Sequence, residues 1–166
     1  MTELLEFLVK ALVEDPAAVV VEELEEDGDL VYEITVADDD LERAAADVDD
    51  LLAGSGVNFD SIGSWIGVAG TATTLAGVYL ELERYDRERV HGARMPLPAI
   101  DQLLHRLAAL TVDEIRALPS MHPGRADVIT GGALVESRIA ARLNVDNLIV
   151  SESDILDGIA LELLDR

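Results

Sequence analysis

Residues 65–76 constrain the fold of this chain more than any other stretch of its sequence. The apolar run Trp65 to Ala69 reaches a glycine at Gly70, and a threonine cluster then opens a helical pattern. A short apolar strand followed by a helix is typical of α/β proteins. The turn between them leaves unbonded backbone N–H groups at the helix N-terminus, where anions bind readily. The pattern therefore predicts a phosphate or nucleotide site on an α/β scaffold.

The composition bounds the chain and excludes several kinds of site. Its 166 residues are 49% hydrophobic but only 4% aromatic, so the core must be built from Val, Leu, Ile and Ala. Cysteine is absent, which excludes disulfides and thiolate metal sites. We find no basic or apolar leader and no apolar run of the roughly 18–20 residues that a membrane span needs. We therefore expect a cytoplasmic protein with no membrane partner.

The charge of the chain is strongly acidic and unevenly spread. With 34 acidic and 12 basic residues, the formal net charge is −22. A field of that sign repels nucleic acid at long range, so RNA is disfavoured as a partner, although an acidic surface also simply aids solubility. Lys10 and Arg43 are the basic residues of positions 1–60, and the others lie after position 80. Any anionic ligand is therefore expected to bind the second half.

Hydrophobic periodicity predicts both strands and helices. Two β-rich runs, 19–24 and 30–36, flank Asp27-Gly28, which is a strong hairpin signal. Further strands are predicted over 65–69 and 148–150, with a short one within 83–96. Helices are predicted over 3–14, 38–52, 71–80, 98–107, 111–118, 125–143 and 154–164, the fifth with a Thr111–Glu114 capping box and the last capped by Ser153. The alternation predicts a single α/β domain over residues 1–166, with a mixed sheet of four or five strands, the hairpin at one side and helices packed over it.

The candidate ligand-binding residues follow from the glycine turn and from two later motifs. The spacing after Gly67 is not a Walker motif, because no Gly-Lys-Ser/Thr follows it. Arg125 is placed in the first turn of a predicted helix, where it can meet phosphate or form a surface pair with Asp127. The two glycines after Thr130 either let helices pack closely or leave room for a planar ligand. The predicted phosphate- or nucleotide-binding residues are Gly70, Thr71, Ala72, Thr73, Thr74, Arg125, Gly131 and Gly132.

No catalytic or metal-ligating residue is predicted. The three histidines, His91, His105 and His122, lack the spacing of metal ligands. Neither Ser55 nor Ser151 has a neighbouring His/Asp arrangement that would make it a nucleophile. The sequence contains no complete catalytic constellation.

Residues 44–164 resemble the C-terminal part of the second lobe of the exopolyphosphatase/guanosine pentaphosphate phosphatase (Ppx/GppA) family. The residues that carry the resemblance are 65–76, Tyr85-Asp86, Val90-His91-Gly92, Leu110-Thr111 with Leu118-Pro119, 122–129, Gly131-Gly132-Ala133 and 150–158. The resemblance implies one lobe of an actin-like (ribonuclease H-like) fold. It also implies hydrolysis of terminal phosphoanhydrides of polyphosphate or nucleotides, with a divalent metal, usually Mg²⁺, and an attacking water.

The chain departs from that family in what it lacks. The family's first lobe is missing here, and with it that lobe's general-base glutamate and first phosphate loop. No Asp-x-Gly-Gly-Gly-Ser strand precedes Gly54. Because phosphoanhydride hydrolysis needs a positioned water, a metal and a charge clamp together, we expect at most weak phosphate binding and no hydrolysis by this chain alone. The surface that would meet the missing lobe leads us to expect a homodimer.

Residues 2–43 resemble the opening of small bacterial KH-domain RNA-binding proteins. Those proteins continue into a basic Gly-x-x-Gly clamp, whereas this chain continues with Glu42 to Asp47. A chimera of two families would explain the combination. Three hypotheses therefore follow: a catalytically incomplete phosphohydrolase lobe, a structural or engineered chimeric protein without ligand activity, and, disfavoured by charge, an RNA-binding module.

Overall fold

The computed structural model describes residues 2–10, 16–26, 29–35 and 38–164, which fall into two compact units, 1–55 and 56–166. The predicted hairpin tip, Asp27-Gly28, lies outside the described residues, as does the end of the first predicted helix. The single domain predicted over residues 1–166 stays a prediction. No described helix has both the length and the apolar character needed to cross a membrane.

The first unit is a hairpin with two helices. Strands β1 (Val20–Glu26) and β2 (Asp29–Thr35) pair antiparallel along their full length, from Val20 opposite Thr35 to Glu26 opposite Asp29. Helix α1 (Thr2–Lys10) contacts β1, and the Thr2 hydroxyl donates to Glu23 over 3.2 Å. Helix α2 (Asp38–Gly54) follows the hairpin. These elements match the sequence-based prediction.

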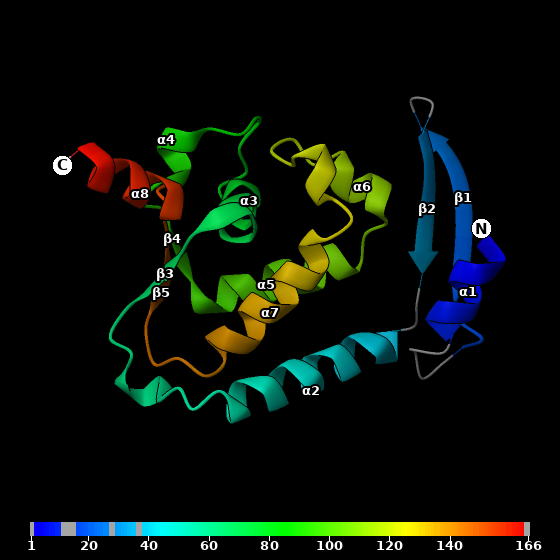
Figure 1. Ribbon diagram of the computed structural model, residues 1–166, viewed down its shortest axis with the longest axis horizontal. Helices are drawn as coiled ribbons and strands as arrows, with labels where there is room; N and C mark the ends of the chain where they lie inside the picture. The colour runs from blue at the N-terminus through cyan, green and yellow to red at the C-terminus, as the bar shows by residue number, and fades with distance from the viewer. Residues whose placement is uncertain (1, 11–15, 27–28, 36–37, 165–166) are drawn as a thin grey trace. The chain divides into compact units, whose positions relative to one another are not determined.

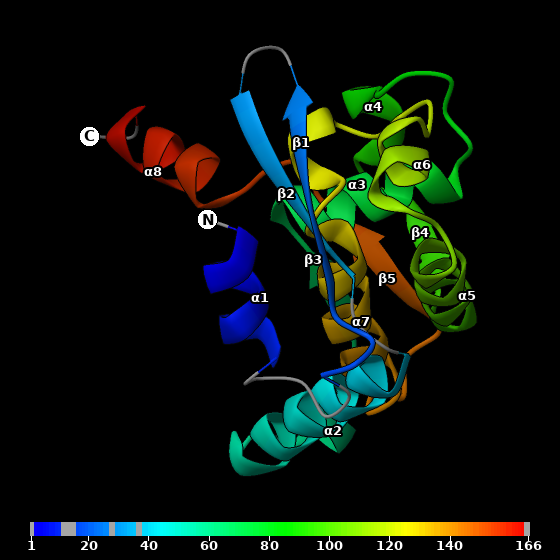
Figure 2. The same ribbon diagram turned by 90° about the vertical axis from the view of Figure 1, so that its right-hand side faces the viewer.

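The second unit holds a mixed three-stranded sheet with helices packed on it (Figure 1, Figure 2). Strand β5 is central: β3 pairs with it in parallel and β4 antiparallel. The elements in chain order are η1 (Phe59–Ser61), β3 (Trp65–Gly67), α3 (Ala69–Tyr79), α4 (Arg87–Val90), β4 (Arg94–Pro96), α5 (Leu97–Ala108), α6 (Val112–Arg116), η2 (Pro123–Arg125), α7 (Ile129–Ala140), β5 (Asn147–Val150) and α8 (Ile155–Leu164).

The α/β class and the mixed sheet are confirmed, but the prediction that the hairpin joins the later strands in one sheet is wrong. Among the described residues the five strands form two sheets. All seven residues of β1 are paired with β2, whereas β3 has only three residues and pairs with β5. Strand β5 is paired on both edges, with β3 on one and β4 on the other, so the sheet of the second unit forms without the hairpin.

The core of the second unit lies between this sheet and helices α3, α5 and α7. Residues along β5 alternate in burial, with Leu148 and Val150 buried and their neighbours partly exposed. Helices α5 and α7 pack on each other, and both contact α3. The largest fully buried side chains are Leu75, Val90, Met95, Ile100, Leu107, Ile129, Leu148 and Val150. The aliphatic core expected from the composition is therefore confirmed.

Two predicted helix ends hold and two are wrong. The Thr111 capping box is present: Glu114 N–H donates to the Thr111 hydroxyl over 3.3 Å, and the bond that Thr111 N–H donates to the Glu114 carboxylate lowers its pKa. Pro98 lies in the first turn of α5. Helix α8, however, is capped by Asp154, whose carboxylate accepts from Leu156 N–H over 2.8 Å, and not by Ser153. The long helix starts at Ile129, because residues 123–125 form a separate 3-10 turn.

Candidate functional site

The turn between β3 and α3 presents backbone donors as the sequence predicts. Val68 is extended and gives α3 no side-chain cap. Ala69 then adopts a left-handed conformation, with φ of 64°, which is unusual for a residue with a Cβ and typical of functional turns. The helix therefore begins two residues earlier than expected, and the first-turn amides around Gly70 have no capping side chain. These amides and the helix dipole favour an anion.

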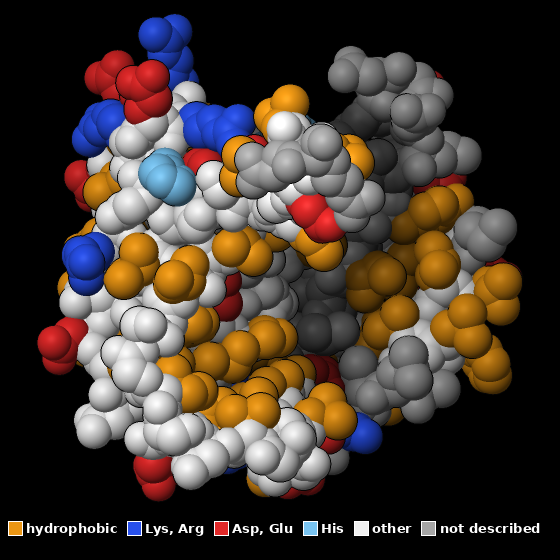
Figure 3. Space-filling view, turned by 60° about the vertical axis from the view of Figure 1, so that its left-hand side comes forward, with side chains coloured by type: hydrophobic (Ala, Val, Ile, Leu, Met, Phe, Trp, Pro, Cys, Tyr) orange, Lys and Arg blue, Asp and Glu red, His pale blue; other side chains and the backbone are white. Residues whose placement is uncertain are grey.

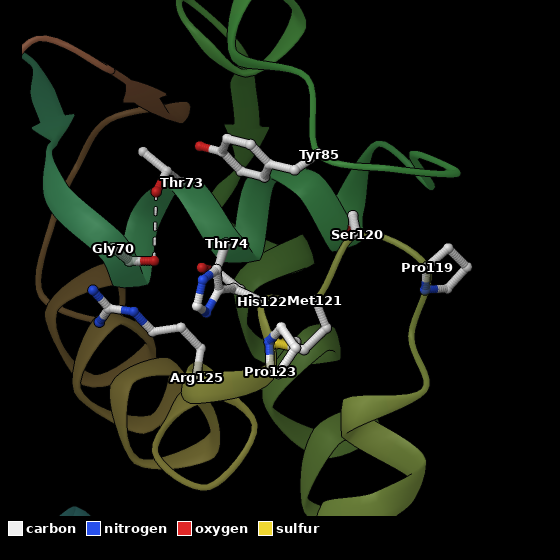
Figure 4. A pocket seen from close by; sticks show the side chains of 10 residues that line it. All are labelled: Gly70, Thr73, Thr74, Tyr85, Pro119, Ser120, Met121, His122, Pro123 and Arg125. Carbon is white, nitrogen blue, oxygen red and sulfur yellow. Dashed lines mark hydrogen bonds between the residues drawn. The ribbon is translucent and has the colours of Figure 1, made fainter.

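A cavity of about 350 Å³ opens beside this turn (Figure 4). Its walls come from α3, from the loop after α3, and from the segment between α6 and α7. Four of the eight predicted site residues line it. The lining residues are Gly70, Thr73, Thr74, Tyr85, Pro119, Ser120, Met121, His122, Pro123 and Arg125.

Arg125 lies directly against Gly70. A Cβ atom at position 70 would overlap the Arg125 guanidinium, so the glycine makes room for the side chain. The predicted alternative, a surface pair with Asp127, is not seen, and the described part of the chain gives Arg125 no carboxylate partner. An uncompensated guanidinium beside the amides of a helix N-terminus is suited to a phosphate oxygen pair.

The threonine side chains lie otherwise than the sequence suggests. The Thr73 hydroxyl donates to the Ala69 carbonyl over 3.0 Å, so its hydrogen is already used. The Thr74 side chain lines the cavity and is almost wholly buried. Thr71 packs on α7, because a Cβ at Gly132 would lie 2.7 Å from the Thr71 methyl group. The donors of this turn are therefore mainly its backbone amides.

The remaining predicted residues lie outside the cavity lining. Ala72 is buried and occupies the space that a Cβ at Gly67 would need, at 2.8 Å. Gly132 serves the close packing of α3 on α7, in agreement with the packing alternative. Gly131 faces open space, since no atom of another residue lies within 4 Å of the place that a Cβ would take there. A ligand-binding role for these three residues stays a prediction.

His122 and Tyr85 line the cavity and were not among the predicted site residues. The Nδ1 atom of His122 accepts a hydrogen bond from Gly124 N–H over 3.2 Å, which leaves Nε2 as the donor of the neutral ring. Burial, together with the hydrogen bond to Glu152, raises the pKa of Tyr85. Both residues stand in the motifs at 85–86 and 122–129, so their position in those motifs was the available signal.

The cavity does not fit a metal by itself. The described residues hold no cluster of three His, Asp or Glu side chains that could bind a cation. Glu152, a carboxylate that contacts the lining residue Tyr85, is also paired with Arg87. The Mg²⁺ implied by the resemblance therefore has no ligand set in this part of the chain.

Comparison with known proteins decides the family. The model of the Ppx/GppA phosphatase family matches residues 32–166. The chain belongs to this family. It is 45% identical over 104 residues to exopolyphosphatase 2 of Mycobacterium tuberculosis, covering 60% of this chain and 33% of that protein. It is 39% identical over 100 residues to a bifunctional 3-dehydroquinate synthase/phosphatase of Fusobacterium nucleatum, covering 60% of this chain and 15% of that one.

Solved structures agree on the fold of this Ppx/GppA member. A crystal structure of an exopolyphosphatase-like protein superposes with a TM-score of 0.72 at 32% identity and covers 76% of this chain and 43% of its own. The crystal structure of the Aquifex aeolicus family member superposes with a TM-score of 0.71 at 17% identity. This match covers 89% of this chain and 54% of that one. The chain thus spans between 15% and 54% of the length of these relatives. Because the family match begins at residue 32, the chimera with a junction near residue 43 and its KH-like part find no support.

Proposed function

We propose that this chain supplies a phosphate-binding wall of an exopolyphosphatase-type site, and that alone it binds short phosphate chains weakly without hydrolysing them. The observation that carries the proposal is the Arg125 guanidinium packed on Gly70 at the uncapped start of α3. The names of the relatives, which include exopolyphosphatases and a phosphatase, supply the ligand class.

The cavity offers three kinds of donor to a phosphate group. Gly70 of the first turn of α3 lines it, at the positive end of the helix dipole, where backbone amides can donate to an anion. Arg125 adds a planar fork that can bond two phosphate oxygens. His122, three residues before Arg125 in the same wall of the cavity, adds its Nε2 hydrogen (Figure 4). The net charge of −22 opposes anion binding at long range, so affinity depends on these short-range bonds.

Hydrolysis requires more than this wall. A phosphoanhydride is cleaved by an in-line water that a base orients, while a metal neutralises the developing charge. The cavity holds no unpaired carboxylate that could act as base, and its lining residues hold no metal ligand set. We therefore expect no hydrolysis from this cavity alone.

A calorimetric titration with tripolyphosphate tests the proposal. We expect weak saturable binding by the wild type and an affinity loss of about tenfold or more in Arg125→Gln, since charge-assisted hydrogen bonds are lost. The matched control is Arg116→Gln, which removes the same charge at an ion pair with Asp113 and should bind as the wild type does. Equal affinity in Arg125→Gln would place the anion elsewhere. Catalytic phosphate release with Mg²⁺ would contradict the incomplete site.

A second candidate function is an interaction protein without ligand activity. Helix α8 favours it, because its described residues include none that is buried and Ile155 and Leu164 are 77% and 82% exposed. Figure 3 shows hydrophobic side chains exposed on one face of the molecule. A homodimer through such side chains would appear in light scattering as a mass that rises with concentration. A monomer that binds tripolyphosphate would exclude this alternative.

A further inference from the structure

Glu152 connects the end of β5 to a loop that borders the cavity. It stands two residues after Val150, and its side chain is only 15% exposed. Its carboxylate accepts from the Tyr85 hydroxyl and pairs with Arg87 Nε over 3.3 Å. Its backbone also takes part: the carbonyl accepts from Arg87 over 3.1 Å, and the N–H donates to His91 Nδ1 over 3.1 Å. One residue thus makes four contacts with residues 85–91.

The segment that Glu152 holds, residues 83–89, runs from the loop after α3 into the short helix α4; it is called loop 83–89 below and is secured at both ends without Glu152. Leu82 and Val90 are buried, at 2% and 0% exposure. Just beyond Val90, the Gly92 N–H donates to the Val150 carbonyl over 2.7 Å. Between these ends the loop is largely exposed, and only Asp86, which caps α4, is partly covered. The fold therefore does not depend on Glu152, whereas the position of the loop does.

Tyr85 is the residue of this loop that reaches the cavity. Its ring lies along α3, with Cδ2 3.7 Å from the place of a Cβ at Gly77, and it lines the cavity beside Thr73. Figure 4 shows the Tyr85 side chain on the opposite side of the cavity from Arg125. Glu152 does not line the cavity itself, so any influence it has on a ligand passes through Tyr85.

We propose that Glu152 is a positioning residue for the anion cavity: it fixes Tyr85 and loop 83–89 as a preformed outer wall for short phosphate chains. The inference rests on the proposed function of the cavity. A wall that is already in place lowers the ordering cost of binding, and a free loop would have to be ordered by each ligand. Tyr85 and Glu152 belong to two sequence motifs, at 85–86 and at 150–158, to which phosphate binding by Arg125 assigns no role.

Tripolyphosphate titrations of a variant series test this role. Glu152→Ala should weaken binding about fivefold to tenfold, while Glu152→Gln, which keeps an acceptor for the Tyr85 hydroxyl, should recover most of the affinity. Tyr85→Phe should also weaken binding, and the losses of Tyr85→Phe and Glu152→Ala should be less than additive in the double variant, because both remove the same hydrogen bond. Additive losses in the double variant, or unchanged affinity in Glu152→Ala, would overturn the proposal.

Limited trypsin digestion gives a readout that needs no ligand. Arg84 lies before α4, and Arg87 and Arg89 lie in this four-residue helix. Because Glu152→Ala releases the segment, it should be cleaved there several times faster than the wild type, at an unchanged unfolding midpoint. Tripolyphosphate should slow this cleavage in the wild type. Cleavage at the wild-type rate in Glu152→Ala overturns the positioning role even where the wild type binds. If the wild type binds no tripolyphosphate at millimolar concentration, the phosphate function is rejected. Faster cleavage of Glu152→Ala would then show only that Glu152 holds the loop, and the positioning role in ligand binding would be overturned as well.

Discussion

Helices α3 and α8 are both short apolar helices that follow a strand, yet they differ completely in burial. In α3, seven consecutive residues from Ala72 to Val78 are buried. In α8, every described residue is at least partly exposed, although Ile and Leu make up most of it. The apolar content of a helix therefore does not decide whether it enters the core.

The difference lies in side-chain size and in what surrounds each helix. Helix α3 carries glycine, alanine and threonine, and it fits between β5 and α7, where a methyl group added at Gly132 would clash with Thr71. Helix α8 comes after the end of β5 and carries large side chains with open space around Gly158. Small residues allow a helix to be buried on all sides, whereas a large apolar side chain needs a matching surface.

The largest expected effect is loss of the α3 core contact. Leu75→Ala should lower the free energy of unfolding by about 3 kcal/mol, because Leu75 is fully buried and its removal leaves a cavity. Ile155→Ala in α8 should change it by less than about 0.5 kcal/mol. Urea unfolding followed by the fluorescence of Trp65 measures both. A comparable loss in Ile155→Ala would show that α8 is covered in solution.

A buried carboxylate in α7 should make stability depend on pH. One oxygen of Glu136 is buried without a hydrogen bond, and burial raises its pKa from 4.5 to about 7. The folded state therefore retains a proton that the unfolded chain releases, so stability falls as pH rises from about 4.5 through 7. Glu136→Gln should raise the free energy of unfolding at pH 8 by up to about 3 kcal/mol.

The same Glu136→Gln variant should lose its advantage at pH 4.5 to 5, where the carboxyl is neutral in the folded state. Glu83→Gln, at an exposed glutamate, is the matched control and should show no such gain. Thermal midpoints between pH 5 and pH 8 compare the two. A gain that is constant over this range would assign the effect to packing instead of ionisation.

Glycine substitutions sharpen the comparison further. Gly67→Ala should cost about 1–3 kcal/mol, because a Cβ there would lie 2.8 Å from both Ala72 Cβ and Leu148 Cδ1, which belong to the fully packed α3 and β5. Chemical denaturation provides the value. A neutral Gly67→Ala would mean that β3 and α3 separate readily.

The smallest effect is expected in α8. Gly158→Ala meets no atom and should favour the helix by up to about 1 kcal/mol, because alanine loses less backbone entropy. Since a ten-residue helix without buried contacts is marginal, we expect more helical circular dichroism at 222 nm with an unchanged urea midpoint. A midpoint that rises with the helicity would contradict the independence of α8 from the core.

The sequence predicted local elements well and their assembly less well. Hydrophobic periodicity gave the helices around residues 71–80 and 98–107, and cap chemistry gave Thr111–Glu114, because these depend on neighbours in the chain. The separation into two sheets could not be predicted, since the pattern of a β-rich run does not indicate which strand it pairs with. In the site, the glycine turn and Arg125 were predictable from motif order. The contact of Tyr85 with Glu152 joins residues 67 positions apart and has no local signal.

The left-handed backbone at Ala69 has a consequence for how the turn behaves. Glu81, just past the other end of α3, is also left-handed, with φ of 51°, so both boundaries of the helix reverse the chain direction sharply. A shift of the first boundary to Val68, or of the second to Leu80 or Leu82, would force another side chain into the same costly conformation. The start of the helix, and with it the direction of its first-turn amides, is therefore set when the protein folds.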